Sequence, residues 1–141
     1  MRYLALDVGD ERIGVAISDG HGFIARPLEI IARRSGPSSF MRVAEIVAGN
    51  GVETIVVGMP LLAHGEEGKQ AQSCRAYVRG LRDHVQVPIV FYDERGSSRR
   101  ATEILVENDS RRKRRRKATD AVAAAVILQH FLDEQSGGPQ A

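Results

Sequence analysis

The hydrophobic residues of this chain change their spacing part-way along the sequence, and that change restricts the fold more than any other feature. Two apolar runs with the composition of β-strands, "RYLALDV" and "RIGVAIS", are separated by the turn residues "GDE", which predicts a β-hairpin. The run "PLEIIAR" predicts a third strand after a glycine-containing turn. From Phe40 onwards the apolar residues recur at helical spacing. The chain is therefore expected to begin as a three-strand meander and to continue with helices.

The rest of the chain predicts helices that alternate with the short apolar strands "ETIVVG" and "PIVFY". The expected helices have apolar stripes at Phe40, Val43, Ala44 and Val47, at Ala71, Cys74, Val78, Leu81 and Val85, and at Ala101, Ile104 and Leu105, and an Ala-rich helix comes last. Strands that alternate with helices imply a parallel part of the sheet, and right-handed crossovers place helices on both faces. We therefore expect an α/β fold with a mixed five-stranded sheet, a three-strand meander followed by two parallel strands.

Length and composition fit a single domain with its own core. Of the 141 residues we expect 1–134 to form this domain and 135–141 to be a disordered tail. No apolar run approaches the ~20 residues of a membrane helix, and the N-terminus lacks the apolar stretch of a signal peptide. The single cysteine excludes an internal disulfide, which fits a reducing cytosol. A cytoplasmic protein without a membrane association is expected.

Positive charge is concentrated in one segment. The chain has 20 Lys and Arg residues against 18 Asp and Glu residues, and residues 111–117, "RRKRRRK", hold seven of the basic ones. Without that segment, 13 basic residues remain and the net charge becomes −5. A block of like charges stays solvated and commonly contacts polyanions. The segment therefore predicts a nucleic-acid contact, with a solvated loop that has no partner as the alternative.

Asp7 lies at the end of the first predicted strand, in "LALDVG". Because side chains alternate along a strand, Asp7 shares a face with Tyr3 and Ala5. A carboxylate among apolar residues is costly unless it is paired or holds a cation. Asp7 is therefore a candidate ligand, and a salt bridge to Arg2 or Arg12 is the structural alternative.

Further carboxylates occur at the ends of later elements. Asp93 and Glu94 follow the last strand, near the strand ends where open α/β sheets bind ligands. Asp120 is expected to open the last helix, with Thr119 as its N-cap. Each acid also has an ordinary explanation, in a turn or at the positive end of a helix dipole. Their shared placement nevertheless predicts one crevice lined by carboxylates.

These ligand types favour a hard divalent cation. The lone Cys74 lies in an apolar helical stripe, and no pair of histidines has the spacing of zinc ligands. Carboxylates suit Mg²⁺ or Mn²⁺, and two such ions can activate a water and stabilise the leaving oxygen of a phosphodiester. The acids and the basic segment together predict metal-dependent cleavage of a nucleic acid.

Four ordered motifs stand out in the chain: "LALDVGDERIGVAISD", "IVVGMPLLAHGEEGKQAQ", "YDERGSSRRATEIL" and "ATDAVAAAVILQHFLDE". Together they resemble the YqgF (RuvX) family, whose members are described as Holliday junction resolvases or as nucleases of the 16S rRNA precursor. The resemblance covers residues 2–134. It implies an RNase H-like fold for the domain, a divalent metal site, and a bacterial cytoplasmic protein that acts on structured nucleic acid.

Carried over residue by residue, the acids of the family fall on Asp7, Glu94 and Asp120, as catalytic and metal-binding residues. The basic stretch that is common in the family before the last helix matches Arg111, Arg112, Lys113, Arg114, Arg115, Arg116 and Lys117. Arg12 and Arg95, close to the acids in sequence, are further candidates for nucleic-acid contacts. Gly96 and His64 stand where the family commonly has Leu and Asp. We expect these two differences to affect substrate contacts more than the chemistry of the three acids.

The order of the strands matters for this set of ligands. If the sheet has the order 3-2-1-4-5, the fourth strand separates the first from the last by about 10 Å. Glu94 must then lean across the end of the fourth strand, or Asp93 or an added metal ion must cover the gap.

The function expected first is an Mg²⁺-dependent endonuclease that processes the end of the 16S rRNA precursor. One alternative is a Holliday junction resolvase of DNA recombination or repair, for which a homodimer would suit the two scissile strands. Another is a ribosome-assembly factor that binds nucleic acid without cutting it. A phosphate loop of an actin-like ATPase or sugar kinase in "LDVGDERIG" would require a second, similar domain, for which 141 residues leave no room.

Overall fold

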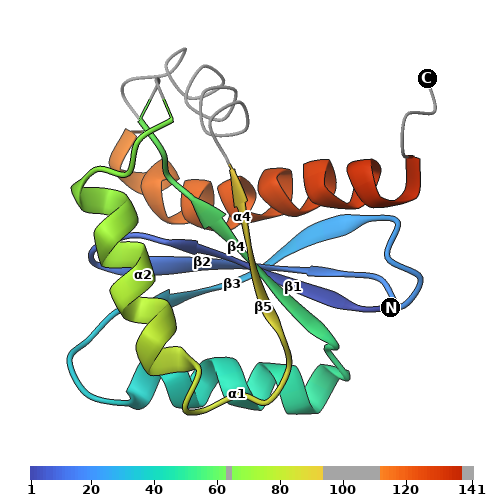
Figure 1. Cartoon of the computed structure of the whole chain (residues 1–141), viewed down its shortest axis with the longest axis horizontal. Helices are drawn as coiled ribbons and strands as arrows, with labels where there is room; N and C mark the ends of the chain where they lie inside the picture. Colours follow the sequence, from blue (N-terminus) through green and yellow to red (C-terminus); the bar gives the residue numbers. More distant parts are fainter. Residues whose placement is uncertain (63–64, 94–111, 138–141) are drawn as a thin grey trace.

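The computed structural model of the chain describes residues 1–62, 65–93 and 112–137 (Figure 1). The described elements, in chain order, are β1 (Tyr3–Val8), β2 (Arg12–Ser18), β3 (Ala25–Ala32), α1 (Ser38–Asn50), β4 (Thr54–Met59), α2 (Lys69–Leu81), β5 (Ile89–Asp93) and α4 (Arg112–Gly137). Every strand predicted from the sequence is present. The helix predicted around Ala101, Ile104 and Leu105 lies outside the described residues, as do residues 138–141 of the expected tail.

The strands form one mixed sheet in the order β3-β2-β1-β4-β5. β1 pairs with β2, and β2 with β3, in antiparallel register, whereas β1 pairs with β4, and β4 with β5, in parallel register. The predicted meander followed by two parallel strands is confirmed. In Figure 1, α1 and α2 lie on one face of the sheet and α4 lies along the other.

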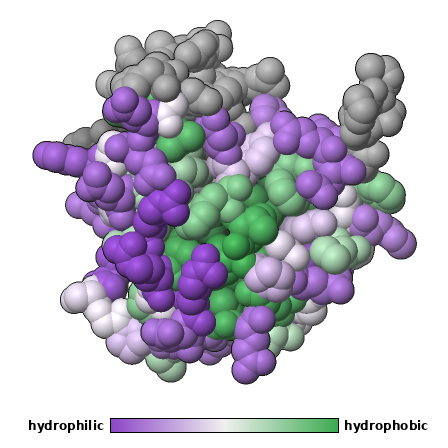
Figure 2. Space-filling model, viewed as in Figure 1, coloured by the Kyte–Doolittle hydropathy of each residue, from purple (hydrophilic) through white to green (hydrophobic). Residues whose placement is uncertain are grey.

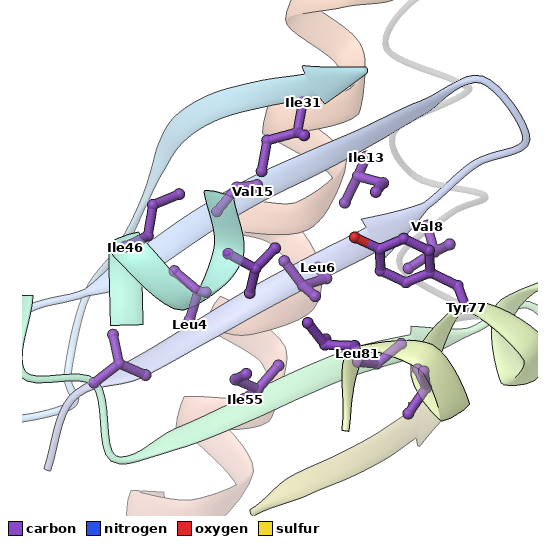
Figure 3. Packing of buried hydrophobic residues seen from close by; sticks show 14 of the residues in the cluster. Leu4, Leu6, Val8, Ile13, Val15, Ile31, Ile46, Ile55, Tyr77 and Leu81 are labelled. Atoms are coloured by element: carbon purple, nitrogen blue, oxygen red, sulfur yellow. The ribbon is translucent and has the colours of Figure 1, made fainter. Parts of the chain in front are cut away.

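The larger hydrophobic core lies between the sheet and the two helices α1 and α2 (Figure 3). The central strand β1 contributes Leu4, Leu6 and Val8, each of which is buried. The predicted stripes of α1 and α2 face this core, and Gly51 ends α1 with φ at 65°, a conformation that glycine adopts easily. Because alternate residues of β1 point into this core, the residues between them point to α4.

The core under α4 includes small residues on both the sheet and the helix. Ala5 and Ala16 of the sheet pack against Ala124 and Leu128 of the helix. Short side chains on the sheet allow a helix axis to approach it more closely than the usual packing distance. This close approach continues to the end of β1, where it places the candidate site.

The start of α4 differs from the sequence prediction. The helix begins at Arg112, so Asp120 lies about two turns inside it and Thr119 is not its N-cap. Lys and Arg are good helix formers, and their propensity carries the helix through the basic segment despite the repulsion between like charges. The helix also runs to Gly137, past the expected end of the domain.

The outer surfaces of these layers differ in character. Figure 2 shows hydrophilic side chains over α2 and an apolar area where the edge strand β5 lies in Figure 1. Val90 of β5 is exposed in this edge strand. In the part of the chain that the structure describes, no helix combines the length and the hydropathy that a membrane span needs.

Candidate functional site

Asp7 is the last residue but one of β1 and lies on the sheet face that α4 covers. Tyr3 and Ala5, four and two residues earlier on the same strand, pack under α4, as the alternation of side chains predicts. Burial, and secondarily the negative charge of Asp120, raise the pKa of the Asp7 carboxyl from 3.8 to about 6. Among the ion pairs of the described residues, none includes Asp7. Asp7 is therefore a largely buried carboxylate beside a second carboxylate, without a cation from this part of the chain.

Gly14 of β2 brings Asp120 to this position. Gly14 is the register partner of Asp7, and a Cβ atom at Gly14 would overlap the backbone carbonyl of Asp120 and approach the backbone nitrogen of Ala121 to 2.9 Å. Only a residue without a side chain permits helix and strand to meet so closely. The role of Gly14 is thus to dock α4 on the sheet beside Asp7, a contact that the sequence did not disclose.

Arg12 holds the Asp120 carboxylate. Its Nε donates a hydrogen bond of 2.8 Å to Oδ2 of Asp120, and the two side chains are 31% and 28% exposed. A pair with this exposure contributes at most about 1 kcal/mol, so its main effect is to orient Asp120. The expected alternative, a salt bridge from Asp7 to Arg2 or Arg12, is wrong, because Arg12 pairs with Asp120 and Arg2 donates to the Asn50 carbonyl.

The two carboxylates fit one side of a site for a hard cation. A divalent ion would offset the cost of burying the Asp7 carboxylate and the repulsion between Asp7 and Asp120. Carboxylate oxygens are the ligands that Mg²⁺ and Mn²⁺ prefer. Within residues 1–62, 65–93 and 112–137, no three His, Cys, Asp or Glu residues gather closely enough to hold a metal ion. The third predicted ligand, Glu94, lies outside the described residues, so the described part contains two of the three acids.

Asp93 ends β5 on the opposite face of the sheet from Asp7. Phe91 packs against the core under α1 and α2, whereas Tyr92 packs under α4. Alternation therefore directs Asp93 to the side of α1 and α2, away from Asp7. β4 separates β1 from β5, as the sequence analysis anticipated. Asp93 is thus a poor substitute for Glu94 as a ligand that shares a cation with Asp7.

The turn between β1 and β2 forms the rim of the site. Gly9 donates its backbone N–H to the Arg12 carbonyl at 2.9 Å and so closes the turn. An open pocket of about 330 Å³ is lined by Gly9, Asp10, Glu11, Arg12 and Asp120. The sequence analysis placed Asp10 and Glu11 in the turn and gave them no part in the site, although their position soon after Asp7 was a usable signal.

The predicted nucleic-acid contacts fall into two groups. Arg12 lies in the site, and residues 112–117 form the first turns of α4, on the same side of the molecule as the β1–β2 turn (Figure 1). Arg95 and Arg111 lie outside the described residues, as do Gly96 and His64. The described geometry therefore places the basic segment on the helix that carries Asp120.

Solved structures define the class of the fold. The chain is similar to Thermus thermophilus RuvC in complex with a Holliday junction substrate, with a TM-score of 0.59 and 16% identity over 97% of this chain and 96% of that one. It is also similar to the Holliday junction resolvase of fowlpox virus, with a TM-score of 0.52 and 11% identity over 95% of this chain and 99% of that one. These similarities establish the expected RNase H-like α/β fold.

The chain belongs to the RuvX family. The model of this family, described as Holliday junction resolvase, matches residues 1–134. A relative from Symbiobacterium thermophilum is 45% identical over 139 residues, which cover 99% of this chain and 96% of the relative. A relative from Pelotomaculum thermopropionicum is 42% identical over 136 residues, which cover 96% of this chain and 88% of the relative. Both are named "Putative pre-16S rRNA nuclease". The resemblance seen in the four motifs is confirmed.

Proposed function

We propose that this chain is a metal-dependent endonuclease that hydrolyses phosphodiesters in structured nucleic acid, and that it acts on the end of the 16S rRNA precursor. The observation that carries the proposal is the state of Asp7, a largely buried carboxylate next to Asp120 without a cation from the described residues. An acid retained only for stability would be expected to have a partner. The names of relatives that are more than 40% identical support the substrate.

Asp7 and Asp120, with Glu94 as the third ligand, would hold Mg²⁺ or Mn²⁺. A bound divalent ion would activate a water and stabilise the charge that develops on the phosphate during hydrolysis. Because the pKa of Asp7 is about 6, its carboxyl is mostly ionised at pH 7.5 and available as a ligand. Arg12 fixes the orientation of Asp120 through the hydrogen bond to Oδ2.

The first turns of α4 would bind the nucleic-acid backbone. Residues 112–117 combine six cationic side chains with the positive end of the helix dipole, where backbone N–H groups have no partner within the helix. Cations at that end repel the dipole, and a bound phosphate would offset this repulsion. Arg95 and Arg111 are proposed to extend the same contact. A cytoplasmic location follows from the proposed substrate.

A Holliday junction resolvase is the second candidate, favoured by the description of the matching family model. In that case the substrate would be a four-way DNA junction in recombination or repair. A homodimer would present one site to each of the two strands that such an enzyme cuts.

The test is a cleavage assay with Mg²⁺, Mn²⁺ or EDTA on two substrates. One is an RNA that carries a 16S precursor end, and the other is a four-way DNA junction. Asp7→Asn, which keeps the size of the side chain, is compared with Asp83→Asn, an exposed acid beyond the end of α2. The proposal predicts metal-dependent cleavage of the RNA by the wild type and by Asp83→Asn, with at least a 100-fold loss in Asp7→Asn.

Each other result selects a different function. Cleavage of the junction alone, with the same dependence on Asp7, would favour the resolvase. Salt-sensitive binding without cleavage of either substrate would contradict the nuclease and favour an assembly factor that binds without cutting. Cleavage that survives in Asp7→Asn would remove Asp7 from the site.

A further inference from the structure

A second pocket lies across the β1–β2 turn from Asp120, on the side of the sheet that α2 covers. It is open, with a volume of about 460 Å³, and its lining includes Asp10, Arg33, Arg34, Ser35, Phe40 and Tyr77. Asp10 also lines the pocket next to Asp120, so the two pockets meet at the turn. A strand of nucleic acid that crosses this turn would pass from one pocket to the other.

Arg33 is a fixed cation in this pocket. Its guanidinium donates to the Gly9 carbonyl at 3.0 Å, to Ser73 Oγ at 2.8 Å and to the Ser73 carbonyl at 3.1 Å. It also lies 5.2 Å from the centre of the Tyr77 ring. None of these partners is a carboxylate, and none of the ion pairs among the described residues includes Arg33. The charge of Arg33 is therefore held in place without being neutralised by a salt bridge.

Arg34 and Ser35 add groups that can bind an anion. Both are exposed, and neither has a hydrogen-bond or ion-pair partner among the described residues. Asp10 is the one carboxylate in the lining, and it accepts a hydrogen bond of 3.3 Å from Ser73 Oγ. Two guanidinium groups therefore face one carboxylate, which gives the pocket a positive balance in a chain whose net charge without residues 111–117 is negative.

We propose that this pocket binds a phosphate of the substrate strand that flanks the cleaved bond, an inference that rests on the proposed nuclease function. Arg33 supplies a positioned, half-buried charge in the lining of the pocket, and Arg34 supplies the exposed contact. Guanidinium groups suit this task because they make charge-assisted, often bidentate hydrogen bonds to phosphate. Since Arg33 also binds the Gly9 carbonyl, it ties the phosphate subsite to the turn that rims the acidic site.

The test measures binding in EDTA, where the proposed chemistry is absent. Fluorescence anisotropy gives the Kd of the labelled RNA and of the labelled junction for the wild type, Arg34→Glu and Arg26→Glu. Arg26 is the matched control because it is exposed and lies on β3, about 20 Å from the pocket end of the strand. Arg34→Glu is expected to weaken binding about tenfold, and Arg26→Glu less than twofold. Arg34→Ala should make the plot of log K against log salt less steep, by the amount expected for the loss of about one phosphate contact.

Trimmed substrates test where the bound phosphate lies. The strand is shortened on one side of the cleavage position and then on the other, and Kd is measured again. One of the two trims should abolish the difference between the wild type and Arg34→Glu. Equal losses for Arg34→Glu and Arg26→Glu, or a difference that survives both trims, would overturn the subsite.

The experiments distinguish a failure of the phosphate subsite from a failure of the proposed nuclease function. A wild type that binds through Arg34 in EDTA but never cleaves would support the subsite and refute the nuclease. A wild type that cleaves with metal but binds equally well in Arg34→Glu would refute the subsite and leave the nuclease standing.

Discussion

At the residue scale, stability and proposed function oppose each other at Asp7. Burial and the Asp120 charge raise the pKa of Asp7 to about 6, so the ionised carboxylate destabilises the metal-free folded chain by about 3 kcal/mol. A cation held between the two acids would reverse that effect. The folded chain would therefore be more stable with a cation bound at this site than without it.

Asp7→Asn is therefore expected to stabilise the metal-free protein. The folded-state pKa is raised, so the wild type loses stability as pH rises from about 4 to about 6 and keeps the full penalty above that range. The variant lacks this penalty, and its advantage should reach about 3 kcal/mol at pH 7.5. Urea unfolding in EDTA at pH 7.5 and at pH 4 measures the difference, which should shrink strongly at the lower pH.

Asp83→Asn is the control, and it should change the free energy of unfolding little at either pH. An Asp7→Asn variant that is less stable than the wild type at pH 7.5 would show that Asp7 is a structural acid with a partner.

At the scale of elements, the contact between α4 and β2 assembles the site. Gly14 and the alanines under α4 allow the helix to cross close to the sheet, and this places Asp120 at the end of β1. The acid of the helix and the acid of the strand are 113 positions apart in sequence, so the geometry of the pair depends on this packing. A change at the contact should affect activity without touching either acid.

Gly14→Ala is expected to impair both stability and cleavage. The added methyl group would overlap the backbone of Asp120, so α4 must shift, at a cost of about 1–3 kcal/mol. Gly49→Ala is the control, since its Cβ would meet no atom within 4 Å and alanine favours the helix by about 0.5–1 kcal/mol. Thermal unfolding and single-turnover cleavage measure the two effects. Full activity in Gly14→Ala would mean that the distance between α4 and β2 does not set the site.

The position at which α4 begins could not be predicted from local sequence patterns. A run of seven cations predicts a solvated loop, because like charges repel one another. Each of its residues nevertheless has a high helix propensity. The propensity prevails in residues 112–117, and Asp120 becomes an interior residue of the helix. Thr119 and Asp120 have the sequence of a helix start, and only the structure shows that the helix has already begun.

At the scale of the whole molecule, the fold follows from hydrophobic spacing, whereas part of the site depends on tertiary contacts. The meander and the parallel strands were predictable because strand and helix periods differ. Asp7 and Asp120 were identifiable from their places at the ends of predicted elements. The pairing of Arg12 with Asp120 and the basic pocket around Arg33 were not, because each joins segments that only the folded chain brings together.

The described part of the molecule places Asp7, Asp120 and residues 112–117 on one side. The β1–β2 turn lies between the acidic pair and the Arg33 pocket, and the first turns of α4 lie on the same side (Figure 1). Attraction of a polyanion to this side would concentrate substrate where a cation could be held.

The most direct test of the central claim is a calorimetric titration of Mn²⁺ into the wild type, Asp7→Asn and Asp120→Asn, with Asp83→Asn as control. If Asp7 and Asp120 hold the cation, the wild type and Asp83→Asn bind Mn²⁺ with similar affinity. Each of the two site variants should then lose about tenfold or more, the equivalent of 1.4 kcal/mol. Equal affinity in the wild type and Asp7→Asn, or no saturable binding by the wild type, would contradict the claim that this pair of carboxylates forms a metal site.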